Sequence, residues 1–143
     1  MPVASVPAAG PAAQPIDARK SVMIDPSGPS IDIGNLDELR ESLRHFAAER
    51  DWEQFHTPKN LSMSVAIEAA ELMEHFQWRT PAMSLELEAP VLVEVAHEIA
   101  DVLLYLVRLA DVLNVDLLRA AHEKMQLNAI KYPAKIALVI KSP

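Results

Sequence analysis

The stretch from Val91 to Leu113 constrains the fold of this chain most, because its helical pattern is apolar on nearly every side. A helix of this kind has to be covered by other helices or by a second copy of the chain. Its longest strongly apolar run, Val102 to Val107, is far shorter than the roughly 20 residues that span a bilayer. The pattern therefore predicts the central helix of a soluble all-α bundle or of an oligomer, with no membrane partner.

Further helical patterns flank this central one. Asn35 begins the first as part of a capping box, Thr57 is a good N-cap for the second, and Asp116 caps the last, which Pro133 ends. The predicted helices span residues 36–51, 58–78, 91–113 and 117–132. Four helices with short links favour an all-α four-helix bundle. The central helix has more apolar faces than three partner helices can cover, which indicates that the bundle assembles into a homo-oligomer.

The domain organisation follows from composition. Residues 1–34 are rich in proline and alanine and predict a flexible tail, residues 35–133 form the single domain, and residues 134–143 are a C-terminal extension too short to classify. Residues 79–90 predict a connection, in which residues 84–89 allow an extra turn.

Charge and cysteine content exclude several classes of partner. The net charge of −7 opposes binding to polymeric nucleic acid or to an anionic membrane surface. The sequence contains no cysteine, so any metal must take oxygen or imidazole ligands, and a reducing cytoplasm fits.

Two acidic pairs lie inside the apolar helices: Glu68 with Glu71, and Glu98 with Asp101. Residues three apart lie on one helix face, and antiparallel packing of the two helices would bring the pairs opposite each other. Buried carboxylates are costly unless a positive charge compensates them. Four carboxylates in one pocket predict a hard cation such as Mg²⁺, which commonly shares its coordination with substrate phosphates.

Two other interpretations of these acids are weighed against the Mg²⁺ site. A lone ExxE pair is most often solvated on an exposed face, but the apolar neighbours of both pairs leave little room for a wet face. Glu94 and His97 have the ExxH spacing of di-iron bundles. A di-iron site is less favoured than a Mg²⁺ site, because the helix that carries Glu68 and Glu71 offers a histidine only at a different offset.

A polar stripe on the last helix complements the acidic pairs. Lys124, Asn128 and Lys131 are spaced four and three apart, and Tyr132 follows directly. Two ammonium groups and an amide can hold phosphate oxygens, although an exposed lysine face is the commoner explanation of such spacing.

Aromatic residues gather in and around the connection before Thr57. Trp52 and Phe55 are not needed to fill a helix interface there, so a nucleobase can stack on them, or they close one end of the bundle. Trp78 lies seven residues after Glu71, and Tyr105 four residues after Asp101, so each continues the helix face of an acidic pair. Both are divided in the same way between ligand contact and the rim of the core.

Four segments carry a family resemblance, in the order RDWEQFHTPKNL, EAAEL with FQW after it, EIADVLLYLVRLA and KMQLNAIKYP. In these residues, over about Leu36 to Pro133, the chain resembles the MazG-like all-α nucleoside triphosphate pyrophosphatases, in particular the dCTP pyrophosphatase branch. The resemblance implies a homotetramer, or in some branches a dimer. It also implies roles for individual residues: Mg²⁺ held by Glu68, Glu71, Glu98 and Asp101; phosphates met by Lys124, Asn128, Lys131 and Tyr132; and the nucleoside surrounded by Trp52, His56, Trp78 and Tyr105.

The expected activity is Mg²⁺-dependent hydrolysis of a deoxynucleoside triphosphate, dCTP or a base-modified dCTP, to the monophosphate and pyrophosphate. Glu68 and Glu71 are the catalytic candidates, and a carboxylate not fully engaged by metal, such as Glu71, would take the proton of the attacking water. The alternatives are a house-cleaning pyrophosphatase with loose base choice, and a catalytically silent helical oligomer that binds nucleotides or a protein partner.

Overall fold

A computed structural model describes residues 33–134, which are helical with short connections and contain no strand. The helices are α1 (Leu36–Ala48), α2 (Pro58–Glu74), α3 (Pro81–Ser84), α4 (Ala89–Val112) and α5 (Leu117–Lys131). The all-α class is confirmed, and each of the four predicted helices has a counterpart. The single turn of α3 is a fifth helix, and it comes earlier in the connection than residues 84–89. The predicted tail and C-terminal extension fall almost entirely outside the described residues.

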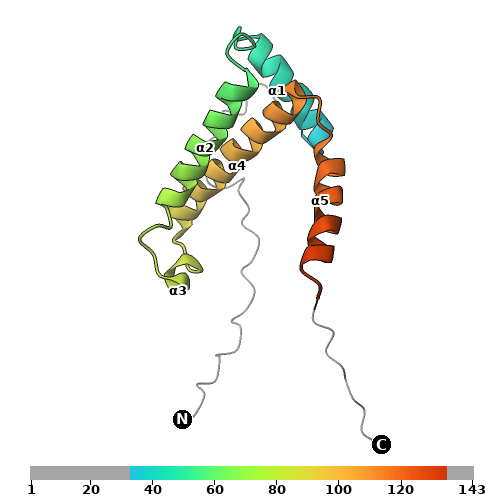
Figure 1. The fold of residues 1–143 in the computed structure, drawn as a ribbon. Coiled ribbons are helices and arrows are strands. Elements are labelled where there is room, and N and C mark those ends of the chain that lie inside the picture. The colour runs from blue at the N-terminus through green and yellow to red at the C-terminus, as the bar shows by residue number, and fades with distance from the viewer. Residues whose placement is uncertain (1–32, 135–143) are drawn as a thin grey trace, which may run out of the picture. The chain divides into compact units, whose positions relative to one another are not determined.

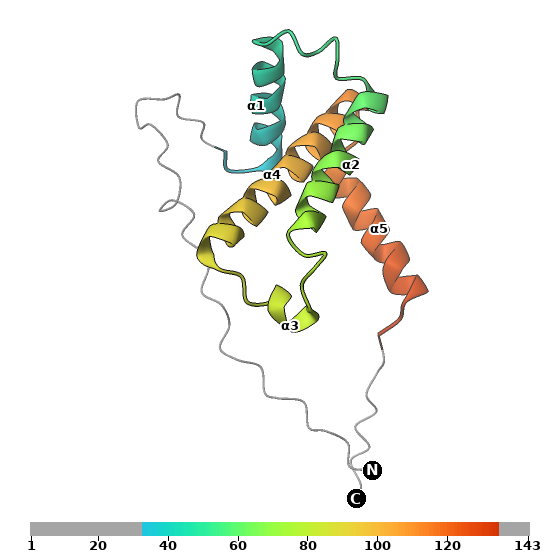
Figure 2. The ribbon, with the colours of Figure 1, turned by 90° about the vertical axis from the view of Figure 1, so that its left-hand side faces the viewer.

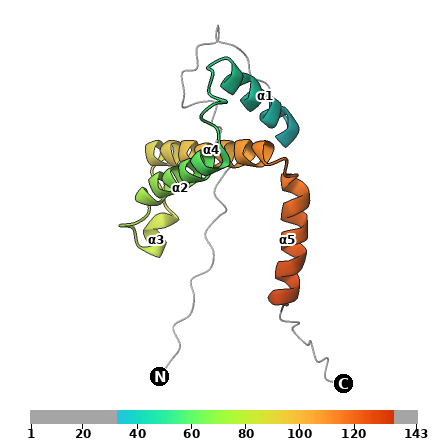
Figure 3. The same cartoon turned by 45° about the horizontal axis from the view of Figure 1, so that its top comes forward.

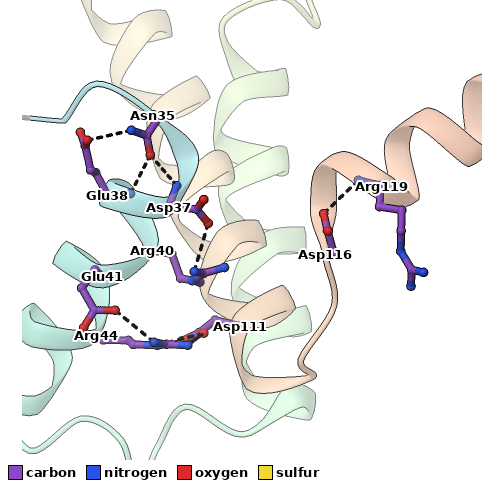
Figure 4. Close-up of polar contacts among 9 residues, drawn as sticks. All are labelled: Asn35, Asp37, Glu38, Arg40, Glu41, Arg44, Asp111, Asp116 and Arg119. Carbon is purple, nitrogen blue, oxygen red and sulfur yellow. Dashed lines mark hydrogen bonds and ion pairs between the residues drawn. The ribbon is translucent and has the colours of Figure 1, made fainter.

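The three predicted N-caps all form. The side-chain oxygens of Asn35, Thr57 and Asp116 accept hydrogen bonds of 2.9–3.2 Å from backbone N–H groups of the first turn of α1, α2 and α5. Glu38 completes the cap of α1, because its carboxylate accepts from the Asn35 side chain at 2.7 Å (Figure 4). These bonds satisfy N–H groups that have no partner within a helix.

Helices α1 and α4 end in the same way. Asp51 and Asn114 have positive φ angles of 55° and 54°. The backbone N–H of the residue after each of them reaches back to Ala47 or Ala110, at 3.0 and 2.8 Å, as in a Schellman motif. Asn114 thus ends α4 as predicted. The predicted extent of the first helix to Asp51 is wrong, because this motif ends the helix at Ala48.

The predicted end of the second helix at Trp78 is also wrong, since α2 stops at Glu74. The chain continues in turns in which the side chain of Arg79 donates from Nε to the carbonyl oxygen of His75 at 2.9 Å. The side chain of Arg79 therefore takes the place of its own backbone N–H at the carbonyl of His75, while that N–H donates to the carbonyl oxygen of Phe76 at 2.9 Å.

The central position predicted for the apolar helix is confirmed. Helix α2 runs antiparallel beside α4, and α1 packs near the C-terminal half of α4 (Figures 1 and 2). The buried apolar side chains come from all three of these helices: Leu39, Ala47, Leu61, Val95, Val107 and Ala110.

Apolar side chains also remain on the surface of the described chain. On α4, Ile99 and Leu103 are 53% and 42% exposed. Helix α5 leaves the end of α4 and runs away from α2, and no residue of α5 is buried (Figures 1 and 3). Residues 33–134 of one copy therefore leave much of the predicted apolar surface uncovered. Within the same range, no helix is long and apolar enough to cross a membrane.

Candidate metal centre and aromatic pocket

Three of the four predicted metal ligands converge between α2 and α4. Glu68 comes from α2, and Glu98 and Asp101 come from successive turns of α4. One carboxylate oxygen from each residue lies within 4.8 Å of the others, and all three residues are half-buried. The antiparallel packing of α2 on α4 brings them together, as the sequence predicts.

The electrostatics of this acidic cluster fit a cation. Burial raises the pKa of the Glu68 carboxyl, and the negative charges of Glu71, Asp101 and Glu98 raise it further. A divalent ion would offset both the desolvation of these carboxylates and their mutual repulsion. Three convergent carboxylates are hard oxygen donors of the kind that bind ions such as Mg²⁺. The cluster can therefore hold a metal ion.

The fourth predicted ligand, Glu71, is exposed and lies outside the group of converging oxygens within residues 33–134. It sits one turn after Glu68 on α2, near enough for its charge to contribute to the raised pKa of Glu68. Its carboxylate is thus adjacent to the acidic cluster without being part of it.

An aromatic pocket of about 230 Å³ lies directly beside the acidic cluster. Three of the predicted nucleoside contacts line it, namely Trp52, His56 and Tyr105, and so does Asp101 of the cluster. The remaining lining is mostly apolar: Leu43, Phe46, Ala47, Leu104 and the side chain of Arg108. A flat apolar group such as a nucleobase suits this lining, and Asp101 connects the two parts of the site.

The ring of Trp52 is held by its neighbours. It meets Phe46 edge-to-face at 5.8 Å between ring centroids, and His56 at 6.1 Å. Trp52 is nevertheless 44% exposed, so part of its surface is free for a ligand within the described chain. Phe55 is 59% exposed and does not line the pocket.

A buried ionic network borders the pocket, and the sequence did not predict it as part of the site. Arg108 donates from Nε to Nδ1 of His56 at 3.2 Å and from Nη1 to Asp111 at 2.8 Å. Asp111 also accepts from Arg44 of α1 (Figure 4). The spacing of Arg108 and Asp111, three apart in an apolar helix, is the signal that could have revealed the pair.

The remaining predicted contacts do not join the pocket within this chain. Trp78 is 87% exposed. The polar stripe of α5 is also exposed and lies apart from α2 (Figures 1 and 3). Its members are Lys124, Asn128, Lys131 and Tyr132, and the ammonium of Lys131 lies 5.2 Å from the ring of Tyr132. Glu94 and His97 are exposed as well, outside the acidic cluster.

A second cavity, of about 440 Å³, lies where α1 meets the junction of α4 and α5. Its charged lining comprises three arginines and three aspartates: Arg40, Arg44, Arg119, Asp37, Asp111 and Asp116. These formal charges balance, and none of the predicted site residues lines the cavity.

The comparison with known proteins agrees with the all-α architecture. Residues 63–141 match the MazG-like family, and the chain belongs to that family. It is 45% identical to human dCTP pyrophosphatase 1 and 43% identical to that of Rattus norvegicus, in each case over 107 residues and 71% of this chain. The chain spans 61% of the length of these two curated relatives. A pyrophosphatase from Archaeoglobus fulgidus, known from a crystal structure, is 42% identical in sequence to this chain, and the two structures have a TM-score of 0.67. The match covers 75% of this chain and 100% of the A. fulgidus chain.

Proposed function

We propose that this protein is a metal-dependent nucleoside triphosphate pyrophosphatase that converts dCTP, or a base-modified dCTP, to the monophosphate and pyrophosphate. The observation that carries the proposal is the position of Asp101, which belongs to the acidic cluster and also lines the aromatic pocket. A nucleotide whose base enters the pocket would have its phosphates at the cluster. The names of the curated relatives, dCTP pyrophosphatase 1, support dCTP as the substrate.

The cofactor we propose is Mg²⁺, held by Glu68, Glu98 and Asp101, with Glu71 as a further ligand or as a base. When bound, Mg²⁺ neutralises the triphosphate and polarises the phosphoryl group under attack. The convergence of three carboxylates within 4.8 Å supports the site. Without such a cation, the same carboxylates would repel the substrate.

The reaction we propose is attack of water oxygen on the α-phosphorus, which breaks the bond to the oxygen that bridges to the β-phosphate. Pyrophosphate leaves with the electron pair of that bond. A carboxylate oxygen of Glu71 accepts the proton of the water, a role that suits a carboxylate adjacent to the cluster but not converging with it. Trp52 and Tyr105 hold the base, so that the α-phosphate lies beside Asp101.

We further propose that phosphate contacts come from the polar stripe of α5 in another copy of the chain. These side chains are exposed, and α5, which carries the stripe, runs away from α2. The uncovered apolar surfaces of α4 and α5 support a homo-oligomer, and we favour a tetramer over a dimer. Trp78, exposed in the turns that follow α2, would reach the nucleoside in the same assembly.

Two parts of the proposal concern the whole chain. Residues 1–34 are a tail that catalysis does not need, residues 35–133 carry the activity, and residues 134–143 are an extension. The compartment we propose is the cytoplasm, with which a sequence free of cysteine agrees.

The decisive experiment is a substrate screen with the full chain and Mg²⁺. All natural deoxynucleoside and nucleoside triphosphates and several base-modified dCTPs are tested for release of pyrophosphate and monophosphate in equal amounts. We expect dCTP or a modified dCTP to be preferred, and Glu68→Gln to abolish turnover. Equal rates with all bases would favour the house-cleaning enzyme instead. No turnover of any nucleotide, together with tight nucleotide binding, would favour the silent oligomer.

A further inference from the structure

The guanidinium of Arg108 is an unusual group for the interior of α4. Its side chain is 10% exposed, and a charge in that position needs a partner because desolvation is costly. Asp111, one turn later and 6% exposed, provides the partner through a hydrogen bond of 2.8 Å between Nη1 and Oδ2. The second contact of Arg108 is made by Nε, which donates to Nδ1 of His56 at 3.2 Å.

Asp111 is itself fixed from outside α4. Arg44 of α1 donates from Nε to both carboxylate oxygens of Asp111, at 3.0 and 2.9 Å, and its Nη2 also contacts Oδ1 (Figure 4). A charged hydrogen bond of this kind is stronger and more directional than a neutral one. The guanidinium of Arg108 is therefore held by Asp111 of α4, which is in turn held by Arg44 of α1.

This contact determines which nitrogen of His56 carries the hydrogen. Arginine stays protonated and has donors only, so Nδ1 of His56 has to be the acceptor. In a neutral imidazole the hydrogen then lies on Nε2, on the side of the ring away from Nδ1. Burial lowers the pKa of His56, and the charge of Arg108 lowers it further, which favours the neutral ring.

The backbone and the pocket restrict the position of the same ring. The backbone N–H of His56 donates to the carbonyl oxygen of Trp52 at 3.1 Å, and the two rings meet edge-to-face. His56 lines the pocket together with Trp52 and Tyr105. A neutral ring held at Nδ1 in this way keeps one hydrogen-bond donor, at Nε2, and has no free acceptor nitrogen.

We propose that Arg108 is a positioning residue for the base pocket: anchored by Asp111, it fixes His56 with the hydrogen on Nε2, and this N–H donates to an acceptor on the pyrimidine edge. The inference rests on the proposed function for the identity of the ligand. A neutral cytosine ring presents two adjacent acceptors, its ring nitrogen N3 and its carbonyl oxygen, so a single fixed donor can meet either of them.

The first measurement is long-range ¹H–¹⁵N NMR of the histidine rings in the full chain, which reports the tautomer without any activity. The chain has five histidines, and the spectrum of His56→Asn assigns His56. We expect a single Nε2–H tautomer in the wild type and a mixture of tautomers in Arg108→Met. That substitution leaves Asp111 paired with Arg44, and Arg108→Lys, which restores a donor and the charge, should recover part of the Nε2–H form.

The second measurement is the Kd of an α,β-imido analogue of dCTP, which cannot be cleaved at the proposed bond, with Mg²⁺ present. Loss of one well-placed hydrogen bond should raise the Kd of Arg108→Met by about three- to tenfold. The matched control is Arg40→Met, an arginine of α1 whose ion pair is with the exposed Asp37. It should leave both the tautomer and the Kd unchanged.

A merely structural role of Arg108 would lower the stability of Arg108→Met while leaving the tautomer and the Kd at wild-type values, which would overturn the proposal. A hydrogen on Nδ1 of His56 in the wild type, or a ring protonated on both nitrogens at neutral pH, would also overturn it. If the wild type binds the analogue with the expected dependence on Arg108 but hydrolyses no triphosphate, the proposed function fails and the positioning role stands. If the wild type does not bind the analogue, the donor role is wrong.

Discussion

Glu68 on α2 and Asp101 on α4 present carboxylate oxygens within 4.8 Å of each other, although they lie on different helices. Burial and three neighbouring negative charges raise the pKa of Glu68. In the absence of metal this arrangement is destabilising, since like charges are forced together in a partly buried place. It is maintained by the packing of α2 on α4, and a bound cation would convert the repulsion into attraction.

Glu68→Gln should therefore separate metal binding from folding. Without metal, the variant should unfold at the same temperature as the wild type or a higher one, because one repelling charge is gone. Mg²⁺ at 100 times its Kd should stabilise the wild type by about 2.7 kcal/mol and the variant much less. Calorimetry with EDTA or Mg²⁺ measures both effects. Glu74→Gln, at the exposed end of α2, is the control and should respond to Mg²⁺ like the wild type. Equal responses of all three proteins would contradict the site.

Asp111→Asn should cost about 3 kcal/mol of stability at neutral pH, because it leaves the buried Arg108 without its anion. Hydrogen bonds from Arg44, and the charges of Arg44 and Arg108, lower the pKa of Asp111. A lowered carboxyl pKa contributes stability that is complete above the unfolded pKa of about 3.9 and is lost as the pH falls through the folded pKa. Urea unfolding should thus show a constant difference in stability between wild type and variant from pH 7 to about pH 4, and a narrowing difference below about pH 4.

Asp37→Asn is the matched control for this measurement. Its ion pair with Arg40 is exposed, so the substitution should cost less than about 1 kcal/mol at neutral pH. A difference for Asp111→Asn that is equally small would show that the network around Asp111 contributes little to folding. A large difference that does not narrow below about pH 4 would show that the charge of Asp111 is not the source of that stability.

The pKa of His56 should lie below the ordinary 6.5, because of burial and then the charge of Arg108, while the carboxylate of Glu53 acts in the opposite direction. NMR titration should find the pKa raised in Arg108→Met and lowered further in Glu53→Gln. The unfolded chain binds more protons as the pH falls through 6.5, so the stability contributed by neutral His56 is full above that pH and declines below it. Shifts of the two variants in the same direction would refute this account.

The sequence predicted the elements that local chemistry determines. Caps at Asn35, Thr57 and Asp116 form because a side-chain oxygen satisfies nearby backbone N–H groups, and those signals lie within four residues. Helix ends were less predictable. Asp51 enters the left-handed region and stops α1, although neither its identity nor its polarity distinguishes it from the helix before it.

The site shows the same division between local and long-range signals. Helical spacing placed Glu98 and Asp101 on one face, and antiparallel packing brought Glu68 to them. Spacing did not reveal that Arg108 would reach His56, because that contact joins α4 to a connection far away in sequence. The distance between the acidic cluster and α5 was equally hidden, since it depends on the turn after Asn114.

Association should be detectable by light scattering, because α4 and α5 leave large apolar side chains uncovered. Ile130, Met125 and Leu118 are 78%, 71% and 67% exposed. We expect a mass that is a multiple of 15.8 kDa at micromolar concentration. Leu106→Glu, on the uncovered side of α4, should shift the mass toward one chain, whereas Gln126→Glu should not. A wild type that is monomeric and fully active would require the site to be complete in one copy.

Trp52→Ala tests whether the aromatic pocket holds the base. Stacking on an aromatic face contributes about 1–3 kcal/mol per base, so the KM for dCTP should rise by roughly ten- to a hundredfold. The kcat should fall less, because the bond that breaks lies at the acidic cluster. The control is Phe55→Ala, an exposed aromatic of the same connection that does not line the pocket, and its KM should stay within about twofold. If Trp52→Ala only destabilises the fold through the lost contact with Phe46, unfolding temperatures will fall while the KM of the folded fraction stays constant, and the base pocket must then lie elsewhere.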